Sequence, residues 1–190
     1  MKIGLYFGSF NPIHIGHLII ANHVANYTDV DQVWLVVSPR NPLKLSSLLL
    51  NEYSRLHLVK IAVEDNLKIK ASDVEFKLPK PSYTIDTLTY LKERYPTNSF
   101  SVIMGSDSFR NIGKWKNFEI LLKNYSLIIY PRPNFPIQNE KISQNIRVLN
   151  APLLEISATA IREAVKNNKS IRYLVSDNVC DEIENAGYYK

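Results

Sequence analysis

The segment that most constrains this 190-residue chain is residues 4–18, GLYFGSFNPIHIGHL. Residues 2–8 are mostly apolar and predict a buried strand, residues 8–12 contain the small and imino residues of a tight turn, and a helical pattern begins near His17. A helix N-terminus presents unpaired backbone N–H groups and a partial positive charge. A strand that leads into such a terminus therefore predicts an anion-binding site where the strand ends.

Two of the four histidines of the chain, His14 and His17, flank this predicted site. Gly16 lies between them and would let a ligand or a backbone segment approach closely. Each histidine could instead cap or pack locally, and metal ligation is a third interpretation, although no cysteine or carboxylate cluster accompanies the pair. The presence of both rings beside one loop favours phosphate chemistry.

The segment GSFNPIHIGHL resembles the HxGH signature of the nucleotidyltransferase superfamily, which also contains the class I aminoacyl-tRNA synthetases. This resemblance implies a Rossmann-like fold that cleaves ATP between its α- and β-phosphates. It also implies a catalytic role for His14 and His17, and ATP contacts from Gly8, Ser9 and Phe10.

The rest of the chain alternates strand-like and helix-like patterns. Several strands are continuously apolar, which is typical of a parallel sheet covered by helices on both faces. We therefore predict an α/β fold with a Rossmann-like, doubly wound, mainly parallel sheet, whose ligand crevice lies at the carboxyl ends of the strands. The predicted strands are 2–8, 33–37, 68–78, 100–104, 125–130 and 146–149, and the predicted helices are 17–27, 52–65, 82–95, 156–166 and 173–186.

Length and composition limit the class of protein. We expect one nucleotidyltransferase domain over residues 1–190, with a C-terminal helical portion over about 156–190. The net charge of +5 arises from 23 basic and 18 acidic residues that are spread evenly, which suits a polyphosphate substrate and argues against a nucleic-acid partner. The chain has no long apolar run, no pattern of a signal peptide and only one cysteine, so we expect no membrane partner and a cytoplasmic location. A homo-oligomer stays open.

A second candidate phosphate-binding loop follows the second predicted strand. Residues 38–44, SPRNPLK, carry two basic side chains, although the same composition suits an ordinary proline-stiffened connection. The loop is similar to the PPHK-like element of bacterial nicotinate mononucleotide adenylyltransferases. Lys44 matches the lysine of that element. Asn41 and Leu43 depart from that element.

Residues 82–88, SYTIDTL, begin a predicted helix with good capping residues, which is a sufficient structural explanation by itself. The segment also resembles the SYT-x-DTL element of the same adenylyltransferases. The resemblance implies that Tyr83 and Thr84 hold the carboxylate of the pyridine ring.

The next predicted strand ends in Gly105 and Asp107, and an acidic residue at this place in such a fold commonly binds ribose hydroxyls. It could equally cap the segment that follows. The pair is similar to the G-x-D element of the family, which implies ATP binding, and Trp115 matches a tryptophan that would stack on the pyridine. Arg132 matches an RPG-like element that implies contact with the mononucleotide, although Asn134 replaces its glycine.

Residues 156–162, ISATAIR, open the predicted late helix and resemble the ISSTxIR element of the family. Ser157 is a suitable N-cap, and a helix N-terminus with a nearby arginine is an anion site. The resemblance implies that Ser157, Thr159 and Arg162 contact ATP, and Ala158 replaces a serine of the element.

Taken over the whole chain, the resemblance implies transfer of the adenylyl group of ATP to nicotinate mononucleotide, giving deamido-NAD and pyrophosphate in NAD biosynthesis. The attacking phosphate is already ionised, so no general base is required. We expect His14 and His17 to contact the α-phosphoryl group, and Lys44, Ser157 and Arg162 to hold the departing phosphates. Mg²⁺ would be the cofactor, held mainly by the phosphates of ATP with no protein metal site.

Three other functions stay open at this point. A phosphopantetheine adenylyltransferase would share the first loop, but it lacks the SYT-x-DTL and tryptophan elements. An aminoacyl-tRNA synthetase is suggested by the letters HIGH, but this length leaves nothing to bind tRNA. A non-catalytic nucleotide sensor on the same fold is supported by the departures at Asn41, Leu43 and Ala158.

Overall fold

The computed structural model describes residues 1–39, 49–137 and 144–190. Strands and helices alternate through most of the chain, as the sequence predicts. The elements are β1 (Lys2–Gly8), α1 (Ile15–Tyr27), β2 (Gln32–Val37), α2 (Glu52–Ala62), β3 (Ile69–Ser72), η1 (Val74–Lys77), α3 (Thr84–Arg94), β4 (Ser99–Gly105), α4 (Ser106–Arg110), η2 (Ile112–Lys114), α5 (Phe118–Asn124), β5 (Ser126–Tyr130), β6 (Ile146–Val148), α6 (Ala158–Lys166) and α7 (Asp177–Ala186).

The strands of the described residues form one parallel sheet in the order β3-β2-β1-β4-β5-β6. This is the doubly wound arrangement that the sequence predicts. The strand order reverses between β1 and β4, and ligands of such sheets bind outside the carboxyl ends of the strands at that point. Here those ends are Gly8 and Gly105.

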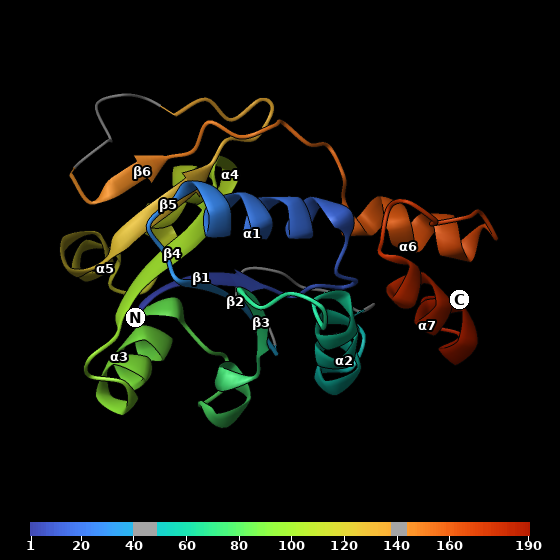
Figure 1. Cartoon of the computed structure of the whole chain (residues 1–190), viewed down its shortest axis with the longest axis horizontal. Helices are drawn as coiled ribbons and strands as arrows, with labels where there is room; N and C mark the ends of the chain where they lie inside the picture. Colours follow the sequence, from blue (N-terminus) through green and yellow to red (C-terminus); the bar gives the residue numbers. More distant parts are fainter. Residues whose placement is uncertain (40–48, 138–143) are drawn as a thin grey trace.

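Each face of the sheet carries its own apolar core, because successive side chains of a strand point to opposite faces. In β1, Tyr6 joins the core under α1, α2, α6 and α7, whereas Leu5 joins the core under α3, α4 and α5. Figure 1 shows α1 and α3 on opposite sides of the strands, with α6 and α7 together at one end of the molecule. This two-sided covering explains why the strands are apolar throughout.

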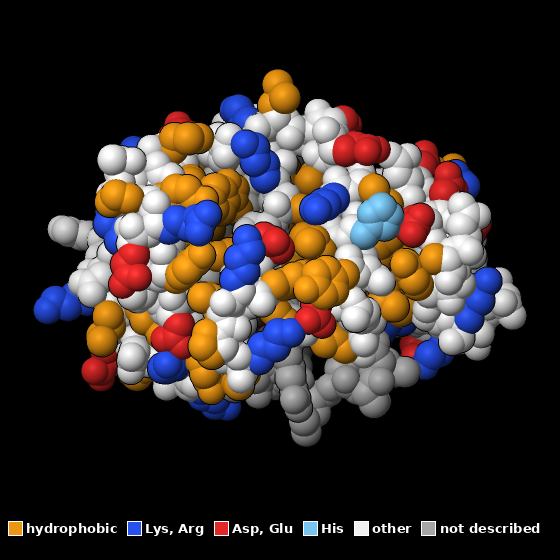
Figure 2. Space-filling model, turned by 90° about the horizontal axis from the view of Figure 1, so that it is seen from below, with side chains coloured by type: hydrophobic (Ala, Val, Ile, Leu, Met, Phe, Trp, Pro, Cys, Tyr) orange, Lys and Arg blue, Asp and Glu red, His pale blue; other side chains and the backbone are white. Residues whose placement is uncertain are grey.

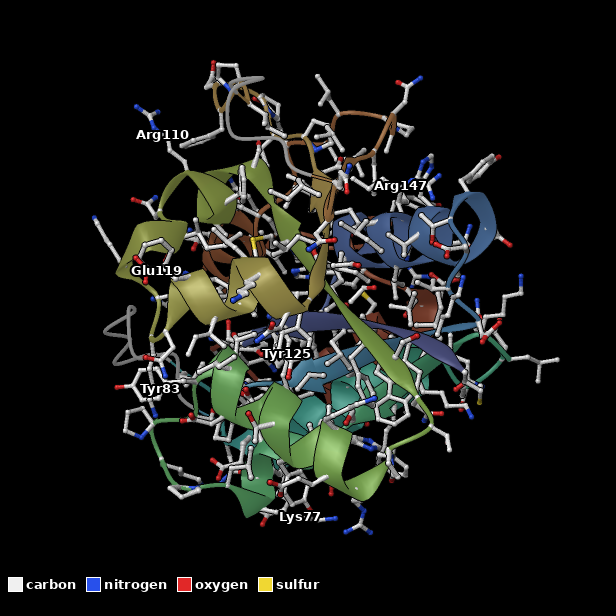
Figure 3. All side chains as sticks on the ribbon, turned by 90° about the vertical axis from the view of Figure 1, so that its left-hand side faces the viewer. Lys77, Tyr83, Arg110, Glu119, Tyr125 and Arg147 are labelled. Carbon is white, nitrogen blue, oxygen red and sulfur yellow. The ribbon has the colours of Figure 1, made fainter. Side chains whose placement is uncertain are left out.

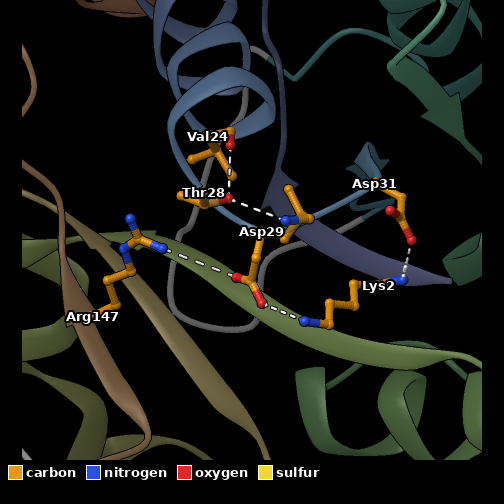
Figure 4. A network of polar contacts seen from close by, with 7 residues as sticks. Lys2, Val24, Thr28, Asp29, Asp31 and Arg147 are labelled. Carbon is orange, nitrogen blue, oxygen red and sulfur yellow. Dashed lines mark hydrogen bonds and ion pairs between the residues drawn. The ribbon is translucent and has the colours of Figure 1, made fainter.

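Polar contacts fix the starts of the strands at the edge opposite Gly8 and Gly105 (Figure 4). The Lys2 ammonium donates to the Asp29 carboxylate at 2.6 Å, and Arg147 of β6 lies 4.0 Å from the same carboxylate. The Asp31 carboxylate accepts the backbone N–H of Lys2 at 2.7 Å. The two ion pairs are exposed, so solvent screening leaves each of them with little effect on stability.

Two predicted boundaries are wrong in an informative way. The strand expected over 68–78 ends at Ser72, because the backbone N–H of Phe76 bonds to the carbonyl of Asp73 at 2.9 Å and closes a turn of 3₁₀ helix. The helix expected from residue 173 begins at Asp177, since Tyr173 has a left-handed backbone (φ 68°).

Other boundaries differ less, and two short helices were not predicted. The first helix starts at Ile15 instead of near His17, and the helix expected over 52–65 ends at Ala62. Helices α4 and α5 were not predicted because each is seven residues or shorter, too short for a clear period. No helix of the described residues has the length and apolar character needed to cross a membrane.

Candidate active site

A cavity of about 850 Å³ opens at the carboxyl ends of β1 and β4. It receives residues from the first loop, the start of α3, the end of β4, the segment after β5 and the start of α6. The predicted site residues that line it are Gly8, Ser9, Phe10, His14, His17, Tyr83, Thr84, Gly105, Asp107, Trp115, Arg132, Ser157, Thr159 and Arg162. Lys44 lies outside the described residues.

Phe10 anchors the first loop, because its side chain is buried in the core. This residue has a left-handed backbone (φ 44°), and its side chain is 1% exposed. Its ring lies edge-on to His17, with 5.0 Å between the ring centroids. A Cβ atom added at Gly8 would come within 2.9 Å of the Phe10 ring, so the end of β1 has no room for a side chain.

The two histidines form a stacked pair, with ring centroids 3.7 Å apart and an interplanar angle of 24°. His14 is the N-cap residue of α1, and its backbone N–H donates to Nδ1 of His17 at 3.3 Å. Nδ1 of His17 therefore carries no proton in this arrangement, and Nε2 is the ring nitrogen that can donate.

Burial and, to a smaller extent, the positive charge of Arg132 together lower the pKa of His14 to about 4. His14 is therefore neutral at pH 7. Gly16 makes this packing possible, because a Cβ there would lie 3.1 Å from the His14 ring. The close approach predicted at Gly16 is thus made by the histidine itself.

The start of α6 meets the first loop across 151 residues of sequence. Arg162 donates from Nη1 to the carbonyl oxygen of Asn11 at 2.7 Å, and from Nη2 to the Thr159 hydroxyl at 3.2 Å. Ser157 caps α6 as predicted, since its hydroxyl accepts the backbone N–H of Ala160 at 3.2 Å. The N-terminal ends of α1 and α6 therefore both contribute residues to one cavity.

At the end of β4, Asp107 pairs with Arg132, with 3.7 Å between Oδ1 and Nε. The backbone N–H of Arg132 also donates to the Ser106 hydroxyl at 2.9 Å. A Cβ at Gly105 would collide with the Asp107 carboxylate, so a side chain at this position would force that carboxylate to move. Arg132, which the resemblance assigned to the mononucleotide, thus pairs with the residue assigned to ATP.

The predicted pyridine-binding residues lie around the start of α3. Tyr83 is the N-cap residue of that helix, and Thr84 is its first residue. Trp115 follows η2 and is partly buried against the core under α3, so its indole is less exposed than the flanking lysines suggest.

Arg55 is a site residue that sequence reasoning missed. Its guanidinium is fully buried and donates to four backbone carbonyls, those of Ser9, Ser38, Pro39 and Leu50. It thereby joins the first loop to the segment that follows β2. Its partners are all main-chain atoms, so the local sequence carried no signal for this role.

Glu75 was also missed, because the sequence around it reads as an alternating strand. It is 2% exposed and lines the cavity, and its carboxylate accepts the Thr87 hydroxyl at 3.0 Å. Burial raises the pKa of this carboxyl group. Ser82, 7% exposed, lines the same wall.

Unsatisfied polar atoms concentrate in this cavity. Eight side-chain atoms of the described residues are buried without a hydrogen-bond partner, and six of them belong to residues that line it. Buried polar groups are normally paired, so their concentration here marks a place that a polar ligand could satisfy, although Asp107 Oδ1 and Arg132 Nε face each other as an ion pair. The six atoms are His14 Nδ1, Glu75 Oε2, Ser82 Oγ, Asp107 Oδ1, Arg132 Nε and Arg162 Nε. Within the described ranges, no group of three or more His, Cys, Asp or Glu side chains could hold a metal ion.

The chain is similar to known proteins over its whole length. The pattern of the family described as cytidylyltransferase-like matches residues 5–164. A protein of Flavobacterium psychrophilum named "Probable nicotinate-nucleotide adenylyltransferase" is 53% identical over the full length of both chains. One of Cytophaga hutchinsonii with the same name is 54% identical over all of this chain and 98% of its own length.

Among solved structures, the nicotinic acid mononucleotide adenylyltransferase of Plasmodium falciparum complexed with NaAD has the same fold. Its TM-score is 0.86 at 24% identity, over 99% of this chain and 97% of that one. The fold is thus that of a doubly wound, parallel α/β protein. The chain belongs to the cytidylyltransferase-like family and, within it, to the nicotinate-nucleotide adenylyltransferases.

Proposed function

We propose that this protein transfers the adenylyl group of ATP to nicotinate mononucleotide, releasing pyrophosphate and forming deamido-NAD for NAD biosynthesis. The observation that carries the proposal is the convergence of five separate motifs on one cavity of about 850 Å³. Small-molecule sites have volumes of about 300 to 1,000 Å³, so this cavity lies at the large end, as two nucleotides require. The names of the full-length relatives agree.

The reaction needs alignment and hydrogen-bond donors more than acid–base chemistry. An oxygen of the ionised mononucleotide phosphate attacks the α-phosphorus of ATP, and the bond to the bridging oxygen breaks, so pyrophosphate leaves with the electron pair. His17 Nε2 is oriented to donate to the α-phosphoryl oxygens, because its Nδ1 is already occupied as an acceptor. His14 would donate as a neutral imidazole.

The departing phosphates need positive charge, which a neutral histidine does not supply. Arg162 is held beside the first loop by its bond to the carbonyl of Asn11, and the N-terminus of α6 adds a partial positive charge. Ser157, Thr159 and the predicted Lys44 complete the proposed phosphate site. Mg²⁺, entering on ATP, would neutralise the charge of the phosphates.

The other proposed roles follow the positions of the side chains. Asp107, with Gly105, would accept hydrogen bonds from a ribose of ATP, and its ion pair with Arg132 holds the carboxylate in place. Tyr83, Thr84 and Trp115 would hold the pyridine.

We also propose a cytoplasmic location, since the buried Cys180 has no disulfide partner.

The test is pyrophosphate release from ATP and Mg²⁺, with nicotinate mononucleotide, its amide analogue and phosphopantetheine offered separately. We expect release with the pyridine mononucleotides and a preference for the acid. Preference for phosphopantetheine would refute the pyridine part of the proposal. No release with any acceptor would favour a nucleotide sensor.

A further inference from the structure

A lysine lies at the end of the cavity where we expect the pyridine ring. Lys116 lines the cavity together with Tyr83, Thr84 and Trp115. Figure 3 shows Tyr83 at the edge of the molecule, below α5 and beside the segment that leads into α3. Figure 2 shows the face formed by α2, η1 and α3, where lysine and arginine side chains alternate with apolar ones. The sequence alone gave no reason to separate Lys116 from the other, solvated lysines of the chain.

The contacts of Lys116 fix its ammonium group across the start of α3. Nζ lies 5.1 Å from the centre of the Tyr83 ring, and it donates to both carboxylate oxygens of Asp86, at 2.9 and 2.8 Å. Asp86 belongs to the first turn of α3, three residues after Tyr83. An ammonium group has three N–H donors, and Asp86 can engage two of them. One donor remains for a ligand above the Tyr83 ring.

The two pyridine substrates differ chiefly in charge at this end of the molecule. The acid and the amide have nearly the same shape, but the acid carries one more negative charge on the ring substituent. A charged donor binds a charged acceptor more strongly than a neutral one. A cation beside the substituent would therefore distinguish them. Of the nearby carboxyl groups, Asp86 pairs with Lys116 without lining the cavity, and Glu75 lines the cavity but is buried and bonded to Thr87.

We propose that the Lys116 ammonium, anchored by Asp86 over Tyr83, pairs with the carboxylate of the pyridine ring and sets the preference for the acid over the amide. The inference rests on the proposed function, and it assigns a specificity-determining side chain to that site. A purely structural role is the competing explanation, in which Lys116 only ties the segment of Trp115 to α3. That role would affect both substrates equally.

The test compares kcat/KM for the acid and the amide mononucleotide in wild-type protein, Lys116→Met and Lys116→Arg, at saturating ATP and Mg²⁺. We expect Lys116→Met to lower kcat/KM for the acid by about tenfold while that for the amide changes less than twofold. Lys116→Arg retains the charge and should restore most of the preference. Lys123→Met is the matched control, since it removes one charge from an exposed residue of α5 outside the cavity.

Equal losses for both substrates, or an unchanged ratio in Lys116→Met, would overturn the inference. Circular dichroism and a thermal melt establish whether each variant is folded. If Lys116→Met does not fold, Lys116→Gln is measured instead, and it must reduce the acid-to-amide ratio. Failure of the proposed function is recognised separately, because the wild-type protein would then form no dinucleotide from either substrate.

Discussion

Removing the buried guanidinium of Arg55 should destabilise the protein and disturb the first loop together. The substitution Arg55→Met keeps the apolar stem but removes four hydrogen bonds to backbone carbonyls, at 2.5, 2.8, 2.8 and 2.9 Å. At about 1 kcal/mol net for each bond, the loss is about 4 kcal/mol. The variant no longer buries a charge, which offsets part of it, so we expect about 3 kcal/mol.

Equilibrium urea unfolding followed by circular dichroism measures this loss. Arg94→Met is the matched control, since Arg94 is exposed and bonds to the Tyr90 hydroxyl at 3.2 Å, and its urea midpoint should stay close to that of the wild type. Because the carbonyl of Ser9 loses its partner, Arg55→Met should also raise KM for ATP more than KM for the mononucleotide. A free energy of unfolding within about 1 kcal/mol of wild type would refute this reasoning.

Three further predictions concern the cavity. Replacing His17 by alanine should lower kcat by about two orders of magnitude, since one charge-stabilising donor contributes about 3 kcal/mol, and steady-state assays with a thermal melt would show activity lost without unfolding. The pKa of His14 is lowered from 6.5 to about 4 in the folded state, so between these pH values the unfolded state binds the extra proton and stability should fall as pH drops. The urea midpoint of His14→Gln should fall less over the same pH range, and an equal fall in variant and wild type would contradict the lowered pKa. Gly105→Ala should displace the Asp107 carboxylate and raise KM for ATP about tenfold or more in initial-rate assays, and an unchanged KM would argue against contact between Asp107 and ATP.

The sequence predicted the sheet because its strands are buried on both faces, so runs such as 33–37 are continuously apolar and need no partner to be recognised. It also predicted Ser157 as an N-cap, because capping depends on residues within one turn. The end of the third strand was missed for the opposite reason. The 3₁₀ turn at Asp73 places Glu75 in the cavity wall, and that position is set by tertiary packing.

Some residues of the candidate site could be predicted from the sequence and others could not. Residues of continuous motifs, such as His14 and His17, could be found from spacing and resemblance. Arg55 and Lys116 could not, because their partners are carbonyls and side chains that only the folded chain brings near. In the sequence, Arg55 reads as a polar position of an amphipathic helix, and Lys116 reads as a solvated charge.

We propose that this cavity directs adenylyl transfer, with cleavage between the α- and β-phosphates of ATP. The most direct measurement follows ATP labelled with ³²P at the α-phosphate, incubated with nicotinate mononucleotide and Mg²⁺, and separates the products by chromatography. We expect the label to appear in deamido-NAD in an amount equal to the pyrophosphate released. Label that stays in ADP or AMP, with no labelled dinucleotide, would contradict it.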